Sequence, residues 1–160
     1  MAAGMHIVEA RAAADVDACR GLFVEYQREL GVSLCFQGFD RELAALPGDY
    51  APPRGRLWLA RAAGEPAGCA ALRPLAPGAA EMKRMYVRPA FRGTGLGREL
   101  ATLVIATARA LGYRTLKLDT LPQLTAAIAL YGKLGFVDTP KYNDNPVAGV
   151  RFMSLDLDSP

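Results

Sequence analysis

Three alternate glycines, Gly93, Gly95 and Gly97, separate a strand-like run from a helix-like run in the middle of this chain. Residues 80–88 alternate as a strand does, whereas apolar residues over 96–111 recur at helical spacing. Glycine lets the backbone turn sharply and approach a ligand closely. The first turn of a helix also presents unpaired N–H groups at the positive end of its dipole. The segment therefore predicts a site for an anion such as a pyrophosphate.

Arg92 and Arg98 flank these glycines and are expected to add charge-assisted hydrogen bonds to the anion. Other loops of this kind fit less well. The loop follows about the fourth predicted strand and lacks the Gly-x-Gly-x-x-Gly spacing of dinucleotide-binding folds. Asp119, at the end of the next predicted strand, keeps that alternative open because it could mimic a ribose-binding acid. The nucleotide triphosphatase loop is excluded because there is no Gly-Lys-Ser/Thr.

The order of elements predicts an α/β (α+β) fold in which a mixed central β-sheet is flanked by helices on both faces. With 160 residues, of which 51% are hydrophobic, the chain is expected to form a single domain over residues 1–160. Asp15 is expected to cap the first helix and Gly31 to end it. The predicted strands cover residues 5–10, 56–61, 66–75, 80–88, 115–119, 136–138 and 150–157, and the predicted helices cover 16–30, 40–46, 95–111 and 122–134.

Charge and composition exclude several classes of protein. A net charge of +3 is too small to indicate nucleic-acid binding. No apolar run is long enough to span a membrane and the start lacks a leader pattern, so we expect a cytoplasmic protein with no membrane partner. Cys19, Cys35 and Cys69 are predicted to be buried thiols and not metal ligands, and His6 an exposed strand residue.

Two motifs resemble the GNAT superfamily of acyl-CoA-dependent N-acetyltransferases. The first is Arg92-x-x-Gly95-x-Gly97, preceded by Met85-Tyr86-Val87-Arg88-Pro89, and the second is Ala129-Leu130-Tyr131-Gly132-Lys133-Leu134-Gly135-Phe136. The resemblance implies acetyl-CoA as cosubstrate and no metal. The backbone of Met85, Tyr86 and Val87 would pair with the pantetheine arm, and the pyrophosphate would be held by Arg92, Gly93, Thr94, Gly95, Leu96, Gly97 and Arg98. Many members have asparagine where this chain has Leu124.

The resemblance also implies direct attack by an amine in a ternary complex, with Tyr131 as the general acid. Glu81 is the candidate general base, because it lies six residues before Val87 and should share its face of the strand. Asp119 is the rival base.

The acceptor is expected to be a primary amine of a small molecule or peptide. Arg73 and Arg84 are candidates to bind a substrate carboxylate, and Tyr26, Phe36 and Phe39 could form an apolar wall. A non-catalytic acyl-CoA sensor and a nucleotide-binding regulatory domain remain as alternatives. The resemblance also allows a homodimer.

Overall fold

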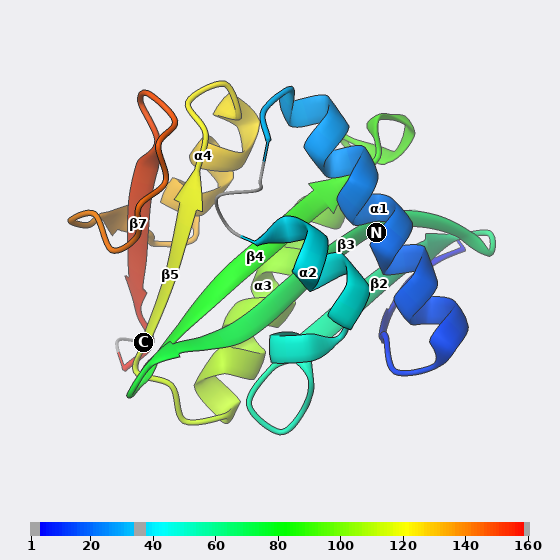
Figure 1. Ribbon diagram of the computed structural model, residues 1–160, viewed down its shortest axis with the longest axis horizontal. Helices are drawn as coiled ribbons and strands as arrows, with labels where there is room; N and C mark the ends of the chain where they lie inside the picture. Colours follow the sequence, from blue (N-terminus) through cyan, green and yellow to red (C-terminus); the bar gives the residue numbers. More distant parts are fainter. Residues whose placement is uncertain (1–3, 34–37, 159–160) are drawn as a thin grey trace.

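The computed structural model describes residues 4–33 and 38–158, and within them one mixed seven-stranded sheet runs through the molecule in the order β1-β2-β3-β4-β5-β7-β6 (Figure 1). Only β4 and β5 pair in parallel; the other pairs described are antiparallel. The strands are β1 Met5–Glu9, β2 Arg56–Ala62, β3 Glu65–Ala76, β4 Ala79–Val87, β5 Thr115–Thr120, β6 Val137–Asp138 and β7 Arg151–Asp156.

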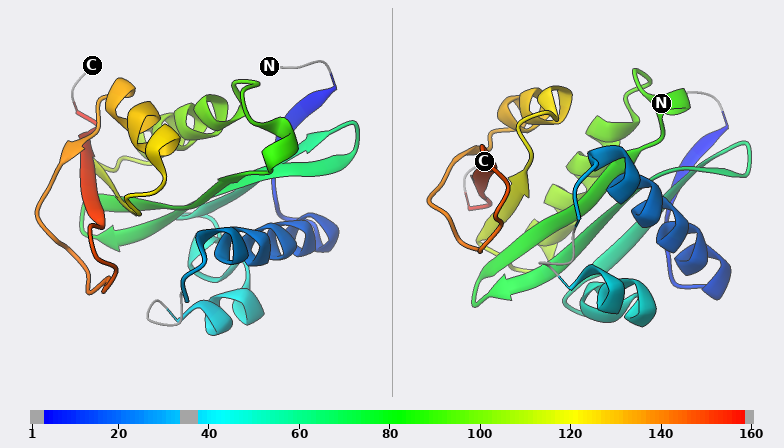
Figure 2. Two further views of the ribbon diagram at one scale, coloured as in Figure 1. Left: turned by 90° about the horizontal axis from the view of Figure 1, so that it is seen from above. Right: turned by 45° about the horizontal axis from the view of Figure 1, so that its top comes forward.

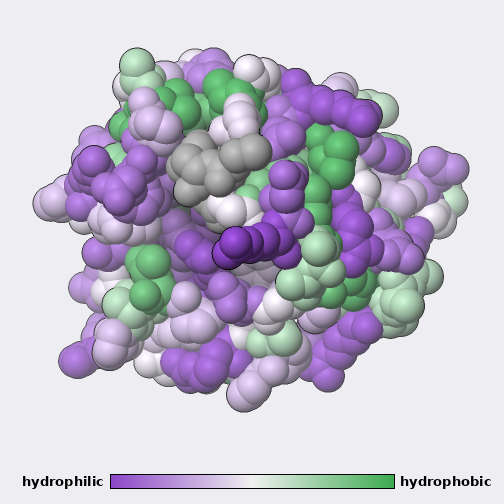
Figure 3. Space-filling view, viewed as in Figure 1, coloured by the Kyte–Doolittle hydropathy of each residue, from purple (hydrophilic) through white to green (hydrophobic). Residues whose placement is uncertain are grey.

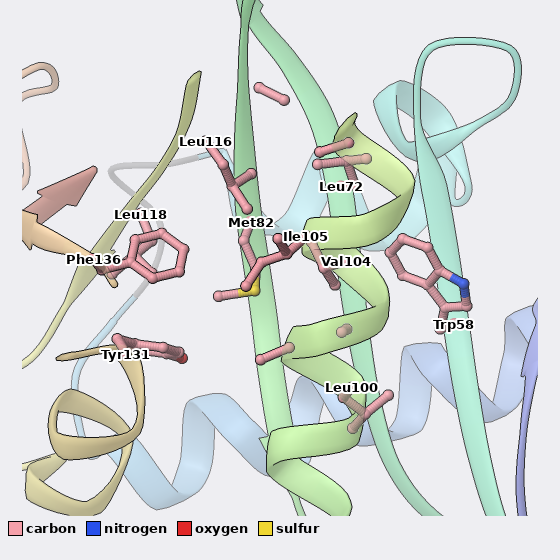
Figure 4. Packing of buried hydrophobic residues seen from close by; sticks show 14 of the residues in the cluster. Trp58, Leu72, Met82, Leu100, Val104, Ile105, Leu116, Leu118, Tyr131 and Phe136 are labelled. Atoms are coloured by element: carbon pink, nitrogen blue, oxygen red, sulfur yellow. The ribbon is translucent and has the colours of Figure 1, made fainter. Parts of the chain in front are cut away.

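Helices cover both faces of this sheet (Figure 2). Helices α1 (Ala13–Leu30) and α2 (Phe39–Ala45) lie on one face, and α3 (Leu96–Ala110) and α4 (Thr125–Lys133) lie on the other. Each face buries its own hydrophobic cluster, and Figure 4 shows the α3–α4 side, where Leu100, Val104 and Ile105 of α3 pack toward the strands. The mixed sheet with helices on both faces that the sequence predicts is therefore confirmed.

The two parallel strands separate soon after they meet. The ladder between β4 and β5 joins Ala79 to Thr115, Ala80 to Leu116 and Glu81 to Lys117, and then ends. Both strands continue, β4 to Val87 and β5 to Thr120, and Figure 1 shows them diverging toward α4. The backbone of β4 beyond Glu81 consequently faces a gap on its β5 side.

A bulge in β4 changes the face of the sheet toward which each side chain after Lys83 points. Lys83 pairs with Ala71, yet the next pair upstream in β3 joins Tyr86 to Cys69, so β4 holds an extra residue there. Arg84, with φ of 55°, occupies the bulge in the left-handed region. Met82 and Val87 consequently contact the same core cluster although they lie five positions apart, an odd spacing that places residues of an unbroken strand on opposite faces. The prediction that Glu81 and Val87 share a face is wrong. It assumes that side chains alternate between the two faces without interruption, and the bulge interrupts that alternation.

The remaining predictions about elements are mostly confirmed. Ala63 and Gly64 form the turn between β2 and β3, where the sequence predicts a break between two strands, and both have positive φ. Gly31 ends α1 in the left-handed conformation, but Asp15 does not cap that helix; the N-cap is Ala12, and the Asp15 carboxylate accepts a hydrogen bond from Arg61 at 3.0 Å. The fourth helix begins at Thr125 and not at Pro122.

The predictions for cysteine and histidine agree with the described residues. Cys19 and Cys69 are buried free thiols, and burial raises the pKa of Cys19 to about 12. Cys35 lies outside the described residues. His6 is an exposed residue of β1.

A buried ion pair attaches β4 to helix α2 on the face below. The guanidinium of Arg84 donates from Nε and Nη2 to the two carboxylate oxygens of Glu42 in α2, at 2.8 Å each. The two side chains are 3% and 16% exposed. Burial alone would raise the pKa of Glu42, but the hydrogen bonds and charge of Arg84 outweigh burial and hold that pKa below its ordinary value of 4.5.

Glu42→Ala should lower the free energy of unfolding by about 3 kcal/mol, because it leaves the Arg84 charge buried without its partner. The matched control is Asp138→Ala, which breaks the surface pair with Arg151, whose side chains are 69% and 39% exposed, and should cost under about 1 kcal/mol. Urea unfolding measures both. The pKa of Glu42 in the folded protein lies below its ordinary value of 4.5. The contribution of the Glu42–Arg84 pair to the free energy of unfolding is therefore complete above pH 4.5 and is lost as the pH falls through the folded pKa. Equal losses in the two variants would contradict the expectation.

Candidate functional site

A pocket of about 440 Å³ lies in the gap between the diverging ends of β4 and β5. Four elements contribute to its walls: the C-terminal half of α1, the end of β4 with the glycine loop, the end of β5, and α4 with the residues before it. Its lining residues are Tyr26, Glu29, Leu30, Met82, Lys83, Arg84, Met85, Tyr86, Val87, Arg92, Gly93, Gly97, Leu118, Asp119, Thr120, Gln123, Leu124, Thr125, Ala126, Ala127, Leu130 and Tyr131.

Most of the expected cofactor-binding residues lie along this pocket. Its lining includes Met85, Tyr86, Val87, Arg92, Gly93 and Gly97. The remaining four, Thr94, Gly95, Leu96 and Arg98, belong to the adjoining loop and first turn of α3 and do not line the pocket. Leu96 is 1% exposed and packs in the core, while Arg98 is exposed.

The glycine loop leads directly into the N-terminus of α3. Gly93 and Gly95 have φ of 77° and 88°, a conformation that other residues adopt only with strain. The first helical bond of α3 runs from the N–H of Glu99 to the carbonyl of Gly95, so the N–H groups of residues 96–98 precede the regular ladder. A side chain at Gly97 would lie 3.8 Å from Val87 and 3.9 Å from Leu130. Both neighbours line the pocket, so a Cβ at this position would make ordinary van der Waals contacts with its wall.

Carboxylates from α1 compensate much of the positive charge that the sequence places around this loop. Arg88 donates to Glu25 at 2.9 Å, and Arg92 donates to Glu29 at 2.7 Å and to the carbonyl of Val87. Figure 3 shows hydrophilic side chains over most of the face that carries α1 and α2. The feature of this loop that could bind an anion is therefore the set of N–H groups at the start of α3, more than the net charge.

Tyr131 points from α4 into the pocket. Its side chain is 5% exposed and packs against the ring of Phe136 at a centroid distance of 5.7 Å. In Figure 4 its hydroxyl end is directed toward the side on which Met82 of β4 lies. Burial raises the pKa of Tyr131 above its ordinary value of 10.0, so the neutral phenol persists at physiological pH.

Glu81 is fully buried and does not line the pocket. Its Oε1 accepts hydrogen bonds from Arg73 Nε at 2.9 Å and contacts Arg73 Nη2 at 2.8 Å. The hydroxyl of Tyr142 donates to Oε2 at 2.6 Å, and the Lys83 ammonium lies 4.0 Å from the same oxygen. Both oxygens of Glu81 thus have protein partners.

Asp119, by contrast, lines the pocket from the end of β5. Its Oδ2 accepts hydrogen bonds from the side-chain amides of Asn143 at 2.9 Å and Asn145 at 3.2 Å. Among the described residues, Oδ1 accepts none. The carboxylate is therefore held in place by neutral donors, with one oxygen still able to accept from a ligand.

One loop, residues 142–145, reaches both carboxylates, and we call it the carboxylate clasp. Tyr142 binds Glu81, and Asn143 and Asn145 bind Asp119. The clasp is itself rigidified, because Asn143 Oδ1 accepts from the N–H of Asn145 and Asn145 Oδ1 accepts from that of Val147. The polar run Tyr142-Asn143-Asp144-Asn145 marks a loop in the sequence, but nothing in it indicates which carboxylates it binds.

Of the residues expected to bind the acceptor amine, some line the pocket and others do not. Tyr26 and Arg84 line the pocket, but the Arg84 guanidinium is bound to Glu42 and that of Arg73 to Glu81. Phe39 is buried at 1% exposure with its ring 5.1 Å from the Arg84 guanidinium, so it belongs to the core. Phe36 lies outside the described residues.

Comparison with known proteins decides the family. Residues 20–136 match the family model described as "Acetyltransferase (GNAT) family". The chain belongs to this family. Over 145 residues it is 42% identical to an uncharacterized N-acetyltransferase of Schizosaccharomyces pombe, and the match covers 89% of each protein.

Solved structures of the GNAT family share the fold. A GNAT-family acetyltransferase of Staphylococcus aureus Mu50 superposes with a TM-score of 0.79 at 19% identity, over 96% of this chain and 99% of that one. YncA of Salmonella typhimurium, solved with its cofactor acetyl-CoA, superposes with a TM-score of 0.69 at 24% identity, over 98% and 96%.

Among residues 4–33 and 38–158, no helix is long and apolar enough to cross a membrane. No group of three or more His, Cys, Asp or Glu side chains among them is arranged to hold a metal ion.

Tyr142→Phe should reduce the free energy of unfolding by about 2 kcal/mol, because it removes a donor from the buried Glu81 carboxylate. Tyr113→Phe is the matched control, since its hydroxyl donates to the neutral carbonyl of Arg54 at 2.8 Å and its loss should cost about 1 kcal/mol. Urea unfolding of the two variants provides the comparison. A loss at Tyr142 no larger than that at Tyr113 would argue against a clasp that stabilises the carboxylate.

Proposed function

We propose that this chain is a single-domain N-acetyltransferase that moves an acetyl group from acetyl-CoA to a primary amine of a small molecule or peptide. The observation that carries the proposal is the gap between β4 and β5, which ends at the glycine loop and N-terminus of α3. Family membership and the binding of acetyl-CoA by YncA, a structure of the same fold, support it.

The geometry of the pocket fits the parts of acetyl-CoA. Beyond Glu81 no strand in the described part of the chain pairs with the β5 side of β4, so the backbone at Met85, Tyr86 and Val87 can pair with an extended arm such as pantetheine. A diphosphate would be bound by the N–H groups that follow Gly95. The apolar part of the lining, including Leu118 and Leu130, suits the methylene groups of the arm.

Asp119 is the proposed general base and Tyr131 the proposed general acid. Bound acetyl-CoA supplies the thioester: the amine nitrogen forms a bond to the acetyl carbon, and the carbon–sulfur bond breaks. Asp119 accepts the proton that the amine loses, because its Oδ1 is open to the pocket. Tyr131 gives its phenolic proton to the departing sulfur. Burial opposes the phenolate, so Tyr131 must then regain a proton from solvent.

Glu81 is better suited to a supporting role than to that of the base. Its two oxygens are bound by Arg73 and Tyr142, and no part of it lines the pocket. We propose that it holds the clasp and the start of the gap in position.

The activity is tested by thiol release from acetyl-CoA with a panel of amines. Asp119→Asn should flatten the dependence of kcat/KM on pH on its acidic side, and Tyr131→Phe should lower kcat about 100-fold while the Kd for acetyl-CoA stays within about twofold. Glu81→Gln is the matched carboxylate control and should keep the pH profile of the parent. If instead Glu81→Gln changes the profile and Asp119→Asn does not, Glu81 is the base.

Gly95→Ala should weaken acetyl-CoA binding about 10-fold, because a side chain at φ of 88° forces the loop away from its anion-binding conformation. Gly112→Ala is the control: Gly112 has the same φ of 88° but follows the other end of α3. Both changes should lower stability by about 1 kcal/mol. Calorimetric titration with acetyl-CoA should then separate them, and equal affinities would remove the glycine loop from the proposed cofactor site.

A further inference from the structure

Most charges in the pocket are compensated by the protein itself. Arg92 contacts the carboxylate of Glu29 at 2.6 Å. Arg84 is bound through two hydrogen bonds to Glu42. These arginines are consequently poor choices for a substrate anion, since each would have to give up a close carboxylate partner.

Lys83 and Asp119 are residues of opposite charge on the two strands that border the gap. Lys83 lies on β4, is 6% exposed and lines the pocket. Its carboxylate neighbour Glu81 is 4.0 Å away and already accepts from Arg73 and Tyr142. An ammonium has three donors, so Lys83 can keep its protein contacts and still donate to a ligand.

Asp119 is the complementary end of this arrangement. The clasp supplies neutral amide donors to its Oδ2, which fix the carboxylate without cancelling its charge. β4 and β5 are no longer paired at this level, so a small ligand can lie between the ammonium on one strand and the carboxylate on the other. A cation and an anion that face one pocket match a ligand that carries both charges.

We propose that the acceptor is a free α-amino acid whose carboxylate is bound by Lys83 and whose amino group is held by Asp119. This inference rests on the proposed function and specifies its substrate. Lys83 then sets specificity: it favours an amine with a neighbouring carboxylate over a plain amine. A polyamine would place a second positive charge near Lys83 and Arg84. An ordinary peptide N-terminus has no carboxylate at this distance from its amine.

The pocket lining also contains apolar side chains. Tyr26 and Leu30 of α1 line it from one side and Leu124 from the other. These side chains would receive the side chain of the amino acid, so apolar amino acids should be preferred.

The test measures KM for three related amines in the parent protein and in variants of Lys83. Leucine, leucinamide and 3-methylbutylamine share one side chain and one amine but differ in the carboxylate. With the parent protein, the KM for leucine should be about 10- to 100-fold lower than for the two compounds without a carboxylate. In Lys83→Met that preference should disappear, through a higher KM for leucine only, and Lys83→Arg should restore part of it.

Lys133→Met is the control, because Lys133 is an exposed residue at the end of α4 and should leave all three KM values unchanged. The Kd for acetyl-CoA, measured on each variant, shows whether the pocket is intact. Acetylation of all three compounds with equal KM would overturn the amino-acid inference and leave the acetyltransferase standing. A Lys83→Met preference equal to that of the parent would also overturn it. Acetyl-CoA binding without acetylation of any amine in the wider panel would overturn both proposals.

Discussion

The early end of the β4–β5 ladder is the constraint on which the rest of the site depends. Parallel strands normally continue their pairing, and here it ends after Glu81 and Lys117. The separated strands expose the side of β4 that a ligand could pair with, and they make room for the pocket. Lys83 and Asp119 line this opening because they lie on β4 and β5, the two strands that border it.

Two local devices stabilise that opening. The bulge at Arg84 reverses the facing of β4, so that Tyr86 packs beneath the sheet while Val87 packs above it. The clasp holds Glu81 and Asp119 from the far side of β5. The first device shapes the strand that faces the proposed cofactor, and the second fixes the two carboxylates. The pocket between the strands consequently has both charged residues, such as Lys83 and Asp119, and apolar residues, such as Leu118 and Leu130, in its wall.

Much of this architecture could be predicted from sequence. Glycines at 93, 95 and 97 and the motif around Tyr131 indicate the family, and apolar periodicity gives the order of strands and helices. The bulge could not be predicted, because an arginine gives no signal for positive φ and one extra residue shifts every later side chain. The bonds from the clasp to Glu81 and Asp119 span 61 and 24 residues, and local pattern carries no information at such separation.

The arginines of β4 and of the glycine loop have a consequence for motion. Arg84 is bound to α2, and Arg88 and Arg92 are bound to α1, so three successive points of one segment are tied to the helical layer below the sheet. Displacing the loop breaks the same contacts as detaching those helices. We therefore expect the loop and these helices to open together in local unfolding, since the free energy of opening one includes that of breaking contacts to the other.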